Sequence, residues 1–225
     1  MKVGEIKTRV RAAIDELEAN NSKFIDEATD SKVLDRIIVN SIYPSLFYVL
    51  TYAPNSMLND SIVKKYAPAN NVSIDASSQV ATVTLPKNFL RLISARMKSW
   101  KYAPTPVAED SIEALMQNDK YAHGTTDRPV TVMIHDDGEL KLQMNRAKDA
   151  NDEAIIHLIE KPDVKEEELQ DEDYNIEIPI KAEAAFIYHI AALSTTSRRD
   201  AISTTLMQIS QNYLGISQHQ STYSE

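Results

Sequence analysis

The sequence predicts an α+β fold in which N- and C-terminal helices pack as a helical layer around a central antiparallel β region. Apolar residues recur at helical spacing near both ends of the chain, and they alternate with polar residues in the middle. The 225 residues suit one large domain or one domain with appended parts. We expect helices over 1–68, a β region with a short helix and an acidic loop over 69–178, helices over 179–216 and a polar tail over 217–225.

The N-terminal part begins with an amphipathic helix. Its apolar residues recur at spacings of three and four: Val3, Ile6, Val10, Ile14 and Leu17. A second helix is expected from about Ser31, and Pro44 fits the first turn of a third, which Pro54 ends. A short helix from about Met57 to Tyr66 is expected to follow. Residues 37–59 carry no charge, but the prolines interrupt them, so we expect a buried helix pair rather than a membrane span.

In the β region, the clearest signal is a hairpin. Residues 130–134 and 140–144 alternate on either side of the turn sequence Asp136-Asp137-Gly138. Alternation also predicts strands over 72–74, 80–84, 154–159 and 176–178, and residues 108–118 are expected to form a short helix. The pattern of residues 89–100 fits a helix in part and does not separate two strand faces, so it leaves both open.

The C-terminal helical block is expected from Pro179 to Tyr213, with a break near Ser197 and Gly215 at its C-cap. Beyond it, the polar tail contains too few apolar residues to fold alone.

Composition excludes several classes of site. The chain has no cysteine, which excludes disulfides, thiol catalysis and Cys-ligated zinc, and it favours synthesis in a reducing compartment. Its four glycines are scattered, so the clustered glycines of a P-loop, a dinucleotide fingerprint or a nucleophile elbow are missing. The five histidines lie far apart and are expected on the surface or in packed positions. We therefore predict no catalytic, cofactor-binding or metal site and no enzymatic activity.

Charge is unevenly distributed along the chain, whose net charge is −9. Residues 149–173 hold eleven acidic and two basic side chains, whereas residues 76–108 hold no acidic side chain. The acidic run is most simply a solvated loop, although it could also engage a basic partner. The basic stretch 87–101 could contact phosphates or the acidic side chains of a neighbouring subunit.

Several short motifs occur in a characteristic order. They include Leu85-Pro86-Lys87-Asn88-Phe89, Gln117-Asn118-Asp119-Lys120-Tyr121, Arg128-Pro129-Val130, the late run 183–193 and Asn212-Tyr213-Leu214-Gly215. In this order the chain resembles the head-to-tail adaptor proteins of short-tailed bacteriophages, crAss-like phages included, which are also called tail tubular or gatekeeper proteins. The resemblance extends over most of residues 1–215.

The resemblance implies a structural connector subunit of the virion that is made in the host cytoplasm. Such a subunit would form a homo-oligomeric, dodecameric ring below the portal protein and continue the channel through which genomic DNA passes without sequence-specific binding. It would also bind a downstream tail protein or second ring protein. In that family the stretch like 89–100 is a strand, which favours a strand here.

Two sets of residues are expected at interfaces. The separation of charge predicts a subunit interface at Lys87, Arg91, Arg96, Lys98, Glu167 and Glu168. The apolar residues near the C-terminus predict portal docking by Leu214, Ile216 and Tyr223. A nucleic-acid-binding regulator that uses residues 87–101 is the alternative function, and a hydrolase with an unfamiliar site is a third hypothesis.

Overall fold

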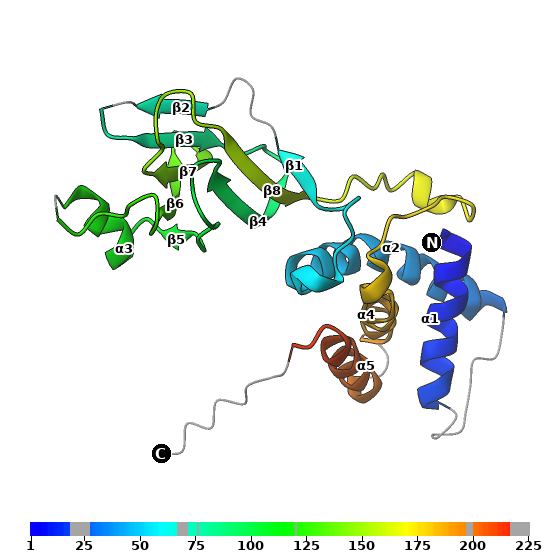
Figure 1. Ribbon diagram of the computed structural model, residues 1–225. Helices are drawn as coiled ribbons and strands as arrows, with labels where there is room; N and C mark the ends of the chain where they lie inside the picture. Colours follow the sequence, from blue (N-terminus) through cyan, green and yellow to red (C-terminus); the bar gives the residue numbers. More distant parts are fainter. Residues whose placement is uncertain (19–27, 67–71, 76, 120, 197–199, 217–225) are drawn as a thin grey trace, which may run out of the picture. The chain divides into compact units, whose positions relative to one another are not determined.

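The computed structural model describes residues 1–18, 28–66, 72–75, 77–119, 121–196 and 200–216. The chain forms two compact units (Figure 1). The helical unit comprises Met1–Ile62 and Pro162–Glu225, and the β unit comprises Val63–Lys161. Helices from both ends of the chain therefore share one unit, and the α+β prediction is confirmed.

The helical unit is built around one mostly buried helix, α4 (Glu183–Thr195). The other helices of the unit are α1 (Val3–Glu18), α2 (Ala28–Tyr52) and α5 (Asp200–Tyr213), with short 3-10 turns at Asn55–Met57, Glu168–Gln170 and Ile180–Ala182. Helix α4 packs against α1, α2 and α5. Because it is surrounded, most of its side chains are buried, Phe186 and Ile190 completely. The predicted first helix, the two C-terminal helices and the Gly215 cap, with φ +69°, are confirmed; Ser197, the predicted break, lies outside the described residues.

The prediction that Pro44 begins a separate helix is wrong, because α2 continues through it. Proline removes one backbone donor from the helix. The buried stripe of Ile38, Ile42, Leu46 and Val49 runs past this point and is at most 2% exposed, so packing maintains the helix despite that loss. By length and composition alone, Lys32–Tyr52 could cross a membrane, but its apolar stripe packs against α4 as in a core helix.

The β unit contains two sheets. The first has the strand order β1-β8-β4, and the second has the order β2-β3-β7-β6-β5. All neighbouring strands are antiparallel except β5 and β6, which are parallel. The strands are β1 (Lys64–Tyr66), β2 (Val72–Asp75), β3 (Val80–Thr84), β4 (Phe89–Met97), β5 (Val107–Ala108), β6 (Val130–Asp136), β7 (Glu139–Asn145) and β8 (Ala154–Glu160).

The two sheets enclose one apolar core. Its completely buried members come from both sheets: Ala81, Val83, Ala95, Met97, Leu142, Met144, Ile156 and Leu158. Trp100 joins this core, and its indole N–H donates to the Arg146 carbonyl at 2.9 Å. Because side chains alternate along a strand, the neighbours of these core residues point to the outer faces of the two sheets. The outer face of the five-stranded sheet carries Thr82 and Gln143 beside Val132 and Ile134, and the outer face of the three-stranded sheet carries Lys65 and Arg96 beside Ile155 and Ile159.

Several strand predictions are confirmed. Strands β6 and β7 form the expected hairpin, with Asp137 at φ +51° and Gly138 at φ +76°, the backbone of a type I′ turn. Residues 89–97 form strand β4, as the family resemblance implied. The short helix is confirmed only in part, because α3 spans Ile112–Leu115 and a 3-10 turn continues it to Asn118.

Other elements differ from the prediction. The short helix expected over 57–66 is absent: Met57 ends a 3-10 turn, and Lys64–Tyr66 forms a strand that pairs with β8. Residues 176–178 form no strand; Ile176 instead exchanges backbone hydrogen bonds with Met1 at the start of α1. The two compact units meet at 62/63 and 161/162, whereas the parts expected from the sequence were bounded at 68 and 178.

Candidate functional site

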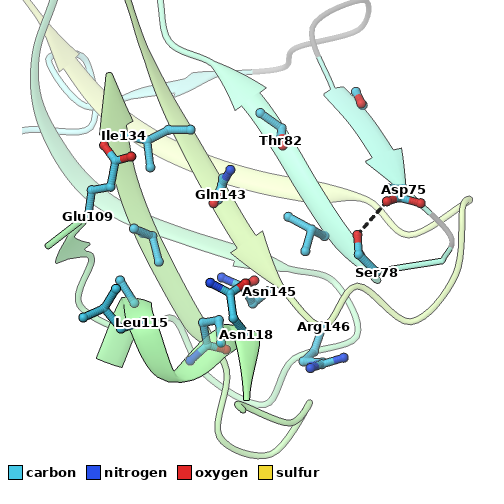
Figure 2. A pocket seen from close by; sticks show the side chains of 15 residues that line it. Asp75, Ser78, Thr82, Glu109, Leu115, Asn118, Ile134, Gln143, Asn145 and Arg146 are labelled. Atoms are coloured by element: carbon cyan, nitrogen blue, oxygen red, sulfur yellow. Dashed lines mark hydrogen bonds between the residues drawn. The ribbon is translucent and has the colours of Figure 1, made fainter. Parts of the chain in front are cut away.

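A groove of about 550 Å³ lies on the outer face of the five-stranded sheet (Figure 2). The ladder registers define its floor, because Ser73 pairs with Thr82, Thr82 with Gln143, and Gln143 with Val132 across four strands. Helix α3 and the following 3-10 turn form a wall through Leu115 and Asn118. The groove is therefore a polar trough bounded by a short helix.

Hydrogen bonds hold several of the polar groups of the groove. The Asp75 carboxylate accepts from the Ser77 amide at 2.9 Å and from the hydroxyls of Ser77 and Ser78 at 2.7 and 2.8 Å. These bonds lower the pKa of Asp75 to about 2, so the groove keeps this negative charge across the physiological range. On the floor, the side chains of Thr82 and Gln143 make no hydrogen bond to any described residue. Their polar groups are free to meet a ligand or water.

One end of the groove is fixed by a strained turn. Arg146 has φ +77°, and its Nε donates to the Gly124 carbonyl at 3.0 Å. The amide of Gly124 donates to Gln117 Oε1 at 3.1 Å, which ties this loop to the helical wall. A Cβ on Gly124 would lie 2.9 Å from the Arg128 carbonyl oxygen, so only glycine fits there. These contacts within the β unit fix the loop at this end of the groove.

The wall of the groove carries an exposed surface that combines apolar and acidic side chains. We call it the α3 surface, and it comprises Glu109, Asp110, Ile112, Glu113, Leu115 and Met116. Ile112 is 72% exposed, Leu115 62% and Met116 43%, although large apolar side chains are more often buried. Within the described part of the chain, the three carboxylates form no ion pair or side-chain hydrogen bond. The Ser111 hydroxyl accepts from the Ala114 amide at 3.2 Å and caps the helix.

A basic face lies on the outer side of the three-stranded sheet, and it comprises Lys65, Arg91 and Arg96. Arg96 pairs with Ile155 between Ala95 and Met97, which point into the core, so its side chain points outward. Lys65 pairs with His157, whose neighbours Ile156 and Leu158 are core residues. Arg91 is half-buried, and burial lowers its pKa, although a guanidinium remains charged. Three basic residues that are distant in sequence therefore share one sheet face.

The structure separates the residues of the predicted subunit interface. Lys87 is exposed in the turn before β4, and Lys98 forms an ion pair with Glu153 at 3.1 Å. Glu167 and Glu168 belong to the helical unit, where Glu168 lies 3.8 Å from Lys165. Whether these residues meet in a neighbouring subunit stays a prediction.

The acidic stretch 149–173 is divided between the two units. Five of its carboxylates already have basic partners in the same chain, in the pairs Lys98–Glu153, Lys64–Glu160, Lys7–Glu172, Lys2–Asp173 and Lys165–Glu168. The stretch is therefore not one uniform patch of unpaired acidic side chains.

The α3 surface was not predicted from the sequence. A signal for it was present, because residues 109–119 contain four acidic side chains and no basic one.

The predicted docking residues also have different environments. Leu214 is completely buried in the helical unit, so its assignment to portal docking is corrected: it is a core residue. Ile216 is half-buried, and its amide donates to the Gln211 carbonyl at 3.0 Å. Tyr223 lies outside the described residues. Ile216 is thus the member of this set that the structure leaves accessible in part.

Metal and histidine chemistry can be assessed for the described residues. Among them, no group of three or more His, Asp or Glu side chains could hold a metal ion. His189 is 5% exposed, stacks on Tyr48 with ring centroids 4.1 Å apart, and has Nδ1 2.9 Å from the Ser45 hydroxyl. It is a packed histidine of the helical core.

The assignment of a function rests on these surfaces and on the motifs of the sequence. The chain matches no protein-family model and no curated protein. A function is accordingly inferred from the architecture of the chain, from its surfaces and from the motifs of its sequence.

Proposed function

We propose that the chain is a structural head-to-tail connector subunit of a bacteriophage, located at the head–tail junction of the virion. In this role it forms a ring below the portal protein, continues the DNA channel and joins a downstream tail or second ring protein. The proposal assigns the chain an assembly role rather than a catalytic one.

The observation that carries the proposal is the architecture of the chain. Residues from both ends build one helical unit, and a separate β unit is inserted between them. Helices that flank a β region are what the resemblance to head-to-tail adaptors implies. Two units in one chain also suit a connector, since each unit can bind a different neighbour.

Charge supports the same proposal. A DNA channel must not hold its polymer tightly, and a subunit with a net charge of −9 repels phosphates on average. The exposed apolar side chains of the α3 surface favour contacts with protein, because apolar patches of this kind mark protein interfaces.

A nucleic-acid-binding regulator is a second candidate, and the basic face favours it. Lys65, Arg91 and Arg96 could contact phosphates together. However, Trp100, the tryptophan of the basic stretch, is 2% exposed and donates a hydrogen bond to the Arg146 carbonyl, so it cannot stack on bases. This alternative requires binding through charge alone.

Co-purification with a portal protein tests the proposal. The chain is co-expressed with the tagged portal protein encoded in the same genome, and the complex is analysed by sedimentation velocity. We expect a large, homogeneous complex that contains many copies of the chain. Failure to co-purify, together with strong and salt-sensitive binding of duplex DNA, would favour the regulator instead.

A further inference from the structure

We propose that neighbouring copies of the chain join head to tail through their β units, with the basic face of one copy against the α3 surface of the next. The inference rests on the proposed function, because it names the contact that builds the ring.

The two surfaces lie on opposite sides of the same unit. The inner faces of the two sheets share one core, so the outer faces point away from each other. Arg96 and Lys65 lie on the outer face of the three-stranded sheet, and α3 borders the groove on the outer face of the five-stranded sheet. A contact between two different patches on opposite sides of a subunit is heterologous, and such contacts produce rings when the rotation closes.

The charges of the two surfaces are complementary. Glu109, Asp110 and Glu113 have no basic partner among the described residues, and neither Arg96 nor Lys65 has an acidic one there. Two other exposed lysines of the β unit, Lys98 and Lys101, are already paired with acids of the same chain. Unpaired charges of opposite sign would steer two copies together and set their register.

The apolar side chains indicate what covers the α3 surface. Ile112, Leu115 and Met116 lie at the i, i+3 and i+4 positions of one short helical segment, and all three are exposed. A nucleic acid would not cover them, and the adjacent carboxylates would repel its phosphates. A protein surface with basic groups fits them, and the chain itself carries such a surface. We therefore commit to a second copy as the occupant.

Disulfide cross-linking tests the contact, because the chain contains no cysteine of its own. The double variant Arg96→Cys/Leu115→Cys of the full chain is oxidised at a protein concentration at which sedimentation shows self-association. We expect a ladder of covalent oligomers that disappears on reduction. A matched control, Glu177→Cys/Leu115→Cys, replaces the basic-face cysteine by one at an exposed position of the helical unit and should give no ladder.

Charge reversal provides an independent test without cysteine. Arg96→Glu should weaken self-association on the order of tenfold, and Glu113→Lys in the same chain should restore part of it. Glu139→Lys, an exposed charge change at the tip of the β6–β7 hairpin, is the control and should have little effect.

The failure of this inference can be distinguished from the failure of the proposed function. If the cysteine variant gives no ladder, if the reversal changes nothing, or if the wild-type chain stays monomeric, the proposed contact is wrong. Portal co-purification then decides separately whether the connector role stands. Loss of salt-sensitive DNA binding in Arg96→Glu, with self-association unchanged, would assign the basic face to nucleic acid and overturn the inference.

Discussion

Acidification should destabilise the helical unit through His189. Burial lowers the pKa of this imidazole from 6.5 to about 4. The unfolded chain therefore binds the proton more readily than the folded protein does, and the stability that neutral His189 contributes is lost as the pH falls below about 6.5. One pKa unit corresponds to about 1.36 kcal/mol, so lowering the pH from 7 to 5 should remove about 2 kcal/mol from the free energy of unfolding.

Urea unfolding followed by far-UV circular dichroism at the two pH values measures this loss. The double variant His189→Phe/Ser45→Ala keeps a ring against Tyr48 and leaves no buried hydroxyl without its partner. Its stability should change little between pH 7 and 5. His135→Gln, at an exposed position, is the control and should behave like the wild type. An equal loss in the wild type and the double variant would refute the assignment of the effect to His189.

Three further substitutions test the packing, each by thermal or urea denaturation. Leu214→Ala should lower the free energy of unfolding by about 2–5 kcal/mol, because Leu214 is completely buried. Ile216→Ala should lower the free energy of unfolding less, because Ile216 is half-buried. Equal effects of the two substitutions would contradict the burial of Leu214. Gly124→Ala should lower it by about 1–3 kcal/mol, since the new Cβ meets the Arg128 carbonyl, and an unaltered midpoint would contradict this contact. Thr131→Val should leave stability unchanged or raise it by about 1 kcal/mol, because the buried Thr131 hydroxyl has no hydrogen-bond partner among the residues that the structure describes; a clear loss of stability would contradict this.

Local patterns in the sequence were sufficient to predict much of the fold. The apolar stripe of the first helix and the hairpin turn at Asp137-Gly138 each depend on residues that are close in sequence. The sequence pattern was therefore sufficient to predict both. Strand β1 could not be predicted in this way, because it has only three residues, shows no alternation and pairs with β8, which is distant in sequence. Pro44 was misjudged for a related reason: burial of its neighbours, which propensity does not describe, keeps α2 intact.

The candidate surfaces were less predictable because the sheet brings them together. Lys65 and Arg96 are separated by 31 positions in the sequence, and strand β8 lies between their strands in the sheet. In the same way, the acidic stretch was continuous in the sequence, yet the chain passes from one unit to the other at 161/162.

Leu214 could have been recognised from the sequence. Leu206, Ser210 and Leu214 recur at a spacing of four, and all three are completely buried. This spacing continues the inner stripe of α5 to its C-cap. Leu214 ends this stripe, but its place next to a polar tail led us to predict that it docks on the portal.

Electron microscopy of the chain bound to its portal protein tests the central claim most directly. Image averages viewed along the portal axis would give the symmetry and position of any additional density. The account predicts a closed ring of this chain below the portal, with β units in contact around the ring. A portal with no added ring, or single copies bound without contact to one another, would contradict it.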